Sequence, residues 1–338
     1  FAVIVSQLAS GFQQTTVSRR DRFVQAYFLL TLQMLRTFAQ RPYFPLYGGI
    51  FASFTGEYLR DVLHYLDEPL RQAEGTQEKA RILTLLGYSV QALGQLDRAK
   101  AFHQQAIEIA RSAGDTRCEV ANLNHLSRVA VAESNYAEAI NYSQRALILS
   151  RQVGDRQGEA NAIANLGYSE VLQAQQLEQA EPEVYEMAID RLQQGLQLAE
   201  KLGDRQSQAL CCSSLGIAHV VLEQAETAVP YLEQGLQAAQ FAGDVYLQGL
   251  NLSYLAEAFY RLQAWDKTIQ SACLGMYLLE QIASAGWRQP AGLLVVLKGQ
   301  LGATEFESIL QQQRSQIVPM IGVDGYDYLA DLLERYQH

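Results

Sequence analysis

A Gly-Asp pair recurs four times in this chain at nearly constant intervals. The pairs begin at Gly114, Gly154, Gly203 and Gly243, so the intervals are 40, 49 and 40 residues. Thirteen residues after each glycine comes a small residue preceded by leucine, and fifteen residues before it comes an alanine. The small residues are Ser127, Gly167, Gly216 and Ala256, and the alanines are Ala99, Ala139, Ala188 and Ala228. Landmarks that keep phase over four units predict a solenoid of stacked repeats of about forty residues.

Each Gly-Asp pair has the chemistry of a helix end followed by a helix start. Between the landmarks, apolar residues recur at helical spacing, as in residues 138–155, so each unit is predicted to contain two helices. Glycine can take the left-handed conformation that ends a helix. Aspartate can accept hydrogen bonds from the free amides of the next helix. We expect the small residues where two helix axes approach closely, with the preceding leucine in the groove beside that contact.

The 49-residue interval contains nine extra residues between Gly167 and Ala188. They fall between the two helices of one unit and are expected to lengthen both helices or to add a turn, with Pro182 at a helix start. The longer hairpin is either a docking feature or a tolerated insertion, and the general tolerance of loops favours the second interpretation.

The composition indicates a globular protein. Of 338 residues, 49% are hydrophobic and 18% are charged, which is enough material for a core. The net charge of −10 argues against nucleic acid as a partner, because such proteins carry a basic face. No run of eighteen apolar residues occurs, so no transmembrane helix is expected.

The four cysteines, Cys118, Cys211, Cys212 and Cys273, form no C-x-x-C pair. Neither a zinc site nor a redox motif is therefore indicated. We expect buried, reduced cysteines on helices, which favours a reducing compartment. The predicted location is cytoplasmic, with attachment to the periphery of a membrane left open.

The landmarks resemble the tetratricopeptide repeat. The small position of the first helix is filled by Gly87, Ser127, Gly167, Gly216 and Ala256, and the small position that opens the second helix by Ala99, Ala139, Ala188, Ala228 and Thr268. The forty-residue length and the Gly-Asp linker are similar to the variant of Pins-type and kinesin-light-chain-like adaptors. The resemblance implies an all-α, right-handed α-solenoid of helical hairpins that binds protein partners. Two departures are a missing closing proline and, in the fifth unit, Gly286-Trp287 in place of Gly-Asp and three residues late.

The resemblance divides the chain into three parts. Residues 1–77 are an N-terminal helical cap or a degenerate leading repeat, residues 78–287 are five repeats of which the third has the nine-residue insertion, and residues 288–338 are a C-terminal helical cap whose last helix starts near Asp324. The glutamine-rich character and residues 321–336 are also similar to cyanobacterial tetratricopeptide proteins, which implies a photosynthetic complex as a setting.

Residues 19–40 have the pattern of one apolar helix with arginines at its start, followed by a break over residues 41–54. One interpretation is a cap on the exposed apolar face of the first repeat. The other is a membrane-surface helix, because Arg19, Arg20 and Arg22 flank a stretch rich in Phe and Leu. The apolar character around the whole helix favours the cap.

No motif for catalysis is visible. His64, His103, His125, His219 and His338 are scattered, with His103 and His219 at packing positions of the repeat. There is no H-E-x-x-H and no G-x-S-x-G, and the Cys211-Cys212 pair lies in a helical pattern without a histidine at a recognisable spacing. We therefore expect no enzyme, no catalytic residue, no metal and no cofactor.

In the repeat that this chain resembles, the first helix of each unit lines a concave surface that binds partners. Counting from the small position gives a predicted groove of sixteen residues: Arg81, Tyr88, Gln91, Asn124, His125, Arg128, Asn161, Asn165, Tyr168, Ser213, Ser214, Ile217, Tyr254, Glu257, Tyr260 and Arg261. Asn and Tyr suit an extended peptide, and concave surfaces attract ligands, although solvated groove residues are the plain alternative. Lysine is absent from these positions, which argues against capture of chaperone tails.

These observations predict a non-catalytic protein–protein interaction scaffold. It would hold a peptide, a helix or a subunit of a partner protein in its concave face, as an adaptor or assembly factor. The alternative is a peripheral subunit or assembly factor of a membrane complex, a photosynthetic one among the candidates, attached through the N-terminal apolar helix.

Overall fold

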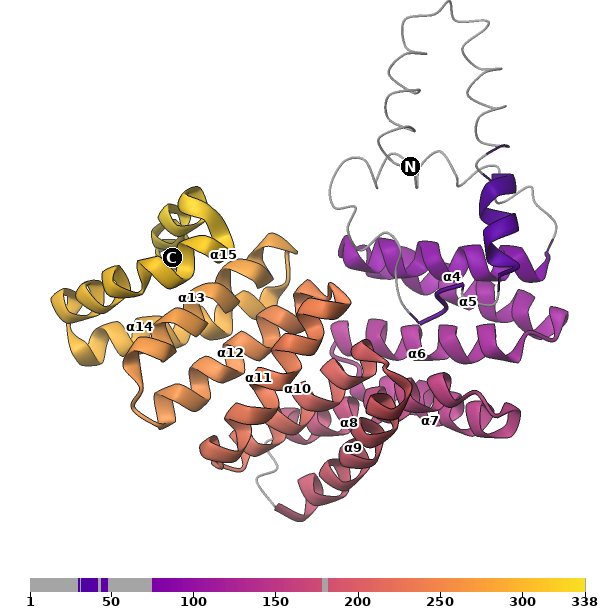
Figure 1. Ribbon diagram of the computed structural model, residues 1–338, viewed down its shortest axis with the longest axis horizontal. Helices are drawn as coiled ribbons and strands as arrows, with labels where there is room; N and C mark the ends of the chain where they lie inside the picture. Colours follow the sequence, from indigo (N-terminus) through magenta and orange to yellow (C-terminus); the bar gives the residue numbers. More distant parts are fainter. Residues whose placement is uncertain (1–29, 31, 42–43, 48–74, 178–181, 338) are drawn as a thin grey trace, which may run out of the picture. The chain divides into compact units, whose positions relative to one another are not determined.

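The computed structural model describes residues 30, 32–41, 44–47, 75–177 and 182–337. Within these residues the regular structure is helical and no strand occurs (Figure 1). A helical segment covers residues 32–39. The later elements are α4 (Gln77–Ala92), α5 (Leu96–Ala113), α6 (Thr116–Ala132), α7 (Tyr136–Val153), α8 (Arg156–Gln176), α9 (Pro182–Leu202), α10 (Arg205–Val221), α11 (Ala225–Ala242), α12 (Val245–Arg261), α13 (Trp265–Gln281), the 3₁₀ helix η1 (Ala285–Trp287), α14 (Arg288–Leu301) and α15 (Ala303–Gln337).

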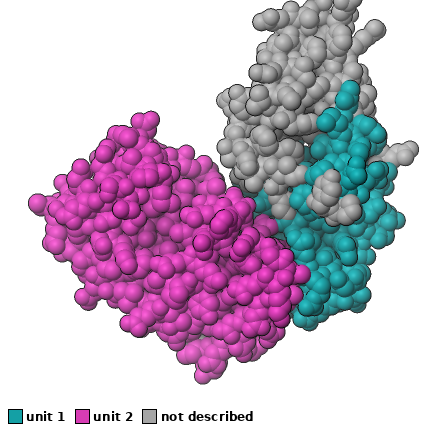
Figure 2. Space-filling model, viewed as in Figure 1, with its two compact units in different colours: residues 1–159 teal, residues 160–338 magenta. Residues whose placement is uncertain are grey.

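The chain forms two compact units, residues 1–159 and 160–338 (Figure 2). In unit 1, α4 packs on α5, α5 on α6 and α6 on α7, and the first helices α4 and α6 also touch. In unit 2 the same pattern runs from α9 to α13, with first-helix contacts between α10 and α12 and between α12 and α14. This consecutive packing of helical hairpins is that of an all-α solenoid, so the predicted fold class is confirmed.

The Gly-Asp linkers end one helix and start the next, as predicted. The four glycines are left-handed, with φ between 68° and 70°. Each following aspartate accepts a hydrogen bond from an amide of the next helix, those of Cys118, Gly158, Ser207 and Leu247, at 3.0–3.2 Å. The glycine ends the preceding helix, where backbone carbonyls lack partners, and the aspartate caps the free amides at the start of the next helix. Two residues therefore suffice to join successive hairpins.

The turns after α4, α6, α10 and α12 also contain a left-handed residue, and the sequence does not mark it. In the first repeat this residue is Gly94. In later repeats it is Ser134, Glu223 or Gln263, each with φ near 60°. Such residues carry a conformational cost that glycine avoids. The surrounding helices therefore hold these turns in place.

In most repeats, the small residue of the first helix packs against a residue of the second helix that lies sixteen positions later. A Cβ on Gly87 would lie 2.5 Å from the ring of His103, and one on Gly216 would lie 2.5 Å from Leu232 Cδ2. In the second repeat, Ser127 and Ser143 hydrogen-bond to each other at 2.7 Å. The predicted close approach of two helix axes is confirmed.

The longer hairpin extends both of its helices. The helices α8 and α9 have 21 residues each, against 17 in α6 and 18 in α7, and α9 begins at Pro182. Of the two predicted alternatives, lengthened helices or an added turn, the structure shows lengthened helices, and the predicted helix start at Pro182 is confirmed. Whether the hairpin docks a partner or is a tolerated insertion stays a prediction.

The C-terminal part continues the stack. Gly322 interrupts α15 with φ 77° and ψ 172°, so a last helix begins beside Asp324, as expected. Trp287, Leu294, Phe306 and Leu332 are buried in one core with α13. The division into caps and five repeats at residues 77 and 287 stays a prediction.

The described part of the N-terminal apolar segment has two different faces. Leu32, Leu35 and Ala39 are buried in one core with Ile82 of α4, whereas Met34 is half exposed. Residues 19–29 of the predicted helix and its arginines lie outside the described residues. No described helix is long and apolar enough to cross a bilayer.

We predict three different outcomes for Gly→Ala changes in unit 2. Gly243→Ala meets no neighbour, so its cost of about 1 kcal/mol comes from the left-handed backbone. Gly216→Ala overlaps Leu232 and costs about 1–3 kcal/mol. Gly299→Ala lies in open space inside α14 and stabilises by about 0.5–1 kcal/mol. Urea midpoints followed by circular dichroism measure all three, and equal shifts would contradict the assignment of separate causes.

Candidate partner-binding site

Nine of the sixteen predicted groove residues are buried: Asn124, His125, Asn161, Asn165, Tyr168, Ser213, Ser214, Ile217 and Tyr254. Several of their polar atoms bond within the helices. Asn165 donates to the Asn161 carbonyl at 2.9 Å, and the Ser213 and Ser214 hydroxyls donate to carbonyls four residues earlier. These side chains present little surface to a partner. The other seven are at least partly exposed: Arg81, Tyr88, Gln91, Arg128, Glu257, Tyr260 and Arg261.

Two predicted groove residues of unit 1 bind the chain's own N-terminal segment. Arg81 donates to the Ala39 carbonyl at 2.7 Å, and His125 Nε2 lies 2.8 Å from the Leu46 carbonyl. Tyr47, on the same segment, is buried and donates its hydroxyl proton to Asp155. The first-helix side of unit 1 therefore already contacts a peptide segment, supplied by the chain itself.

His125 also belongs to a buried pair. Its ring stacks on His103 at a centroid distance of 5.0 Å, and His103 Nδ1 lies 2.7 Å from Asn122 Oδ1. Asn122 donates through its amide nitrogen to Thr84 at 2.7 Å, so its oxygen accepts from a neutral His103. Burial lowers the pKa of His103 to about 4 and lowers that of His125 as well, helped by His103 and Arg128. His103 was expected in the core or in the groove lining, and the structure buries it completely.

The cysteines are free and buried, as predicted. Burial raises the pKa of Cys118, Cys212 and Cys273 to about 12, so these thiols stay protonated at neutral pH. Among the described residues no three His, Cys, Asp or Glu side chains are grouped as a metal site would require. His219 is partly exposed and stacks on Tyr231, whereas His64 and His338 lie outside the described residues.

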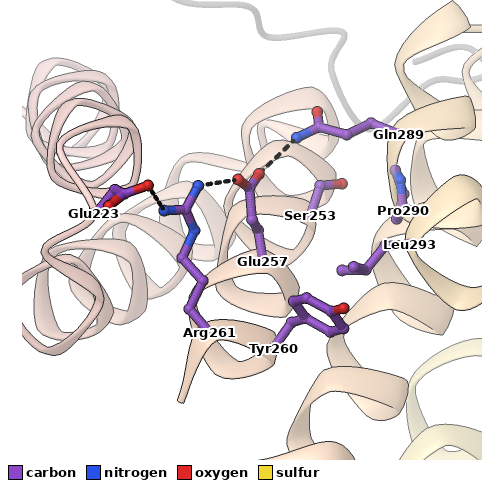
Figure 3. Close-up of a pocket in the computed structure, with 8 residues that line it drawn as sticks. All are labelled: Glu223, Ser253, Glu257, Tyr260, Arg261, Gln289, Pro290 and Leu293. Atoms are coloured by element: carbon purple, nitrogen blue, oxygen red, sulfur yellow. Dashed lines mark hydrogen bonds and ion pairs between the residues drawn. The ribbon is translucent and has the colours of Figure 1, made fainter. Parts of the chain in front are cut away.

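A pocket in unit 2 contains three of the seven exposed residues of the predicted groove (Figure 3). Its volume is about 440 Å³. The lining residues are Glu223, Ser253, Glu257, Tyr260, Arg261, Gln289, Pro290 and Leu293. They come from the turn after α10 and from the consecutive first helices α12 and α14. Three of them, Glu257, Tyr260 and Arg261, belong to the predicted set.

Charged groups occupy one side of this pocket. Arg261 donates to Glu257 Oε1 at 3.1 Å and lies 3.5 Å from Glu223 Oε1 (Figure 3). Gln289 donates to Glu257 Oε2 at 3.4 Å. The side chain of Glu223 is 84% exposed, so its pairing with Arg261 is weak. Glu257 is the best-positioned carboxylate, since Arg261 and Gln289 hold its two oxygens from different sides.

The other side of the pocket is aromatic and apolar. The Tyr260 ring lies 5.6 Å from the Trp265 ring, and its hydroxyl accepts a hydrogen bond from Gln300 at 2.6 Å. These two contacts fix the orientation of the tyrosine. Pro290 is buried and Leu293 is half-buried, and both belong to α14. The pocket therefore combines an orientated ring with an aliphatic wall.

Our sequence reasoning missed five lining residues. Ser253 stands three positions before Ala256, as Asn124 stands before Ser127 and Ser213 before Gly216, so the same repeat position points to it. Pro290 and Leu293 follow Leu250 and Ser253 by forty residues, so carrying the repeat phase one repeat further would have found them. Glu223 lies in a turn, for which no groove position was counted.

The fold defines the chain as an all-α helical-repeat protein. No family model matches the sequence, and no curated protein matches it. Among solved structures, the chain is similar to the Signal Transduction ATPase with Numerous Domains (STAND) protein with a tetratricopeptide repeat sensor from Pyrococcus horikoshii, at 16% identity and TM-score 0.49. That match covers 81% of this chain and 40% of the STAND protein, so the chain spans less than half of it. The apo form of RapI is similar at 15% identity and TM-score 0.45, over 83% of this chain and 79% of RapI.

We predict that Tyr47→Phe lowers the free energy of unfolding by about 1–3 kcal/mol, because a buried carboxylate loses a hydrogen-bond donor. Tyr136→Phe is the control, since the half-exposed Tyr136 hydroxyl bonds to no described residue. Urea midpoints of the two variants would be compared with the unchanged chain. Equal midpoints for both variants would show that the Tyr47 contact contributes nothing.

We predict that stability falls as the pH is lowered from about 7 toward about 4. The pKa of His103 is about 4 in the folded chain and returns to its ordinary value of 6.5 on unfolding. Between these two pH values the unfolded chain therefore binds a proton at His103 and the folded chain does not. The loss begins near pH 6.5 and is complete near the folded pKa. His103→Gln should reduce the dependence of the urea midpoint on pH between 7 and 5, and His125, whose pKa is lowered too, keeps part of that dependence. An unchanged slope in this variant would refute the assignment.

Proposed function

We propose that this protein is a non-catalytic interaction scaffold that holds a peptide, helix or subunit of a partner protein on its first-helix face. The observation that carries the proposal is the pocket between α12 and α14, whose lining contains Glu257, Tyr260 and Arg261. The position of these three residues in the repeat predicts the same groove.

The size and composition of the pocket suit an anchor side chain. A volume of about 440 Å³ lies at the lower end of the range for ligand sites and accommodates one large side chain with part of its backbone. Tyrosine and arginine are the residue types that most often dominate binding energy at protein interfaces. An extended segment anchored here would continue over neighbouring first helices.

The finer assignment is an adaptor or assembly factor. It is supported by the Gly-Asp linkers, which the chain shares with the Pins-type and kinesin-light-chain-like variant of the repeat. In this proposal residues 78–287 are the five binding repeats, flanked by caps over residues 1–77 and 288–338. Attachment to a membrane or a photosynthetic complex has no observation among the described residues in its favour and is not part of the proposal.

The test is selection from a random peptide library displayed against the immobilised full chain. We expect enrichment of a peptide family whose affinity, measured by calorimetry, falls about tenfold or more in Tyr260→Ala, equivalent to about 1.4 kcal/mol.

The matched control is Tyr231→Ala on the second helix α11, which removes a partly exposed tyrosine away from the pocket. Circular dichroism confirms that both variants fold. Absence of any enriched peptide, or equal losses in the two variants, would contradict binding at this pocket.

A further inference from the structure

The charge of the pocket in unit 2 is unbalanced. Glu223 and Glu257 face the single cation Arg261, so the lining of the pocket carries one net negative charge. The whole chain has the same sign, with a net charge of −10. A charged group that enters the pocket is therefore attracted if it is positive and repelled if it is negative.

Glu257 has unused capacity to accept hydrogen bonds. A carboxylate offers about four lone-pair sites, and among the described residues only Arg261 and Gln289 donate to this one. Ser253, whose hydroxyl donates to the Gly249 carbonyl, is buried, so Glu257 is the main acceptor near this end of the pocket. A guanidinium or an ammonium group supplies donors and no acceptor, which matches this inventory.

An acidic anchor is disfavoured by the same contacts. Arg261, the cation that would attract it, is already directed at Glu257 and Glu223. A carboxylate that reached Arg261 would have to approach both glutamates. The cost of bringing like charges together would offset the attraction.

The walls of the pocket suit the aliphatic stem of a basic side chain. Leu293 and Pro290 form an apolar surface opposite the charged groups, and the Tyr260 ring stands beside them (Figure 3). Lysine and arginine bury their methylene groups along such surfaces while the charged end stays with polar partners.

We propose that this pocket takes an arginine or lysine side chain of an extended segment of the partner protein. Glu257 receives the charged group, and Tyr260 and Leu293 hold the stem. This assignment rests on the proposed scaffold function and names the chemistry of the partner.

The test uses the peptides selected on the full chain. We expect arginine or lysine to be enriched at one position of the family. For the best peptide, Glu257→Gln lowers affinity about tenfold, and replacing the basic residue with norleucine lowers it by a similar factor. The two changes together lower it little further, because each removes the same interaction. Glu233→Gln on α11 is the matched control, since it removes one exposed carboxylate elsewhere, and it leaves affinity within about twofold.

The other outcomes separate the two claims. Enrichment of acidic or apolar anchors would overturn the basic-anchor assignment and leave the scaffold function standing. A basic anchor with equal losses in Glu257→Gln and Glu233→Gln would also overturn it, because attraction would then be general. Additive losses in the double change would show that the basic residue binds elsewhere. Failure to enrich any peptide would overturn the scaffold function itself.

Discussion

The stacking of hairpins depends on the hydrogen bonds that the aspartate of each Gly-Asp linker accepts. One carboxylate oxygen caps the helix that follows, and in at least three linkers the second oxygen makes another bond. Asp115 Oδ2 accepts from Gln77 and Arg81 of the preceding first helix at 2.9 and 2.8 Å, and Asp155 accepts from Tyr47. In the third linker, Asp204 Oδ2 accepts from Ser207 of its own helix at 2.6 Å. Asp115 and Asp155 thus connect the start of a helix with residues that lie more than thirty positions earlier in the chain. The left-handed glycine makes this possible because it lets the chain reverse within two residues.

Close packing explains why so much of the predicted groove is buried. Small residues at one position let the helices of a hairpin approach until polar side chains beside them are enclosed. The enclosed amides then bond between successive first helices: Asn122 donates to Thr84 and Asn251 donates to Ser213, each across 38 residues at 2.7 Å. In unit 1 the segment around Leu46 and Tyr47 covers further positions. The accessible part of the predicted set in unit 2 is consequently concentrated at the pocket of Glu257, Tyr260 and Arg261.

The sequence was sufficient for features that depend on a particular residue type. Glycine followed by aspartate has few alternatives at a left-handed helix end, and Pro182 marks a helix start, so both were predictable. The turns at Ser134, Glu223 and Gln263 were not, because tertiary packing there enforces a conformation that these residues do not prefer. Burial of Asn124 and Asn165 was equally hidden, since asparagine serves both as a surface residue and as an internal donor. The pocket residues on α14 were missed because the landmarks of the repeat fade after residue 287, although the forty-residue phase continues.

The central claim is that a partner binds along α12 and α14 in unit 2. Hydrogen–deuterium exchange of the full chain, with and without a saturating selected peptide, tests it most directly. The account predicts slower exchange over residues 253–261 and 288–293, with little change in the second helices α11 and α13. Protection confined to unit 1, or to α11 and α13, would contradict it.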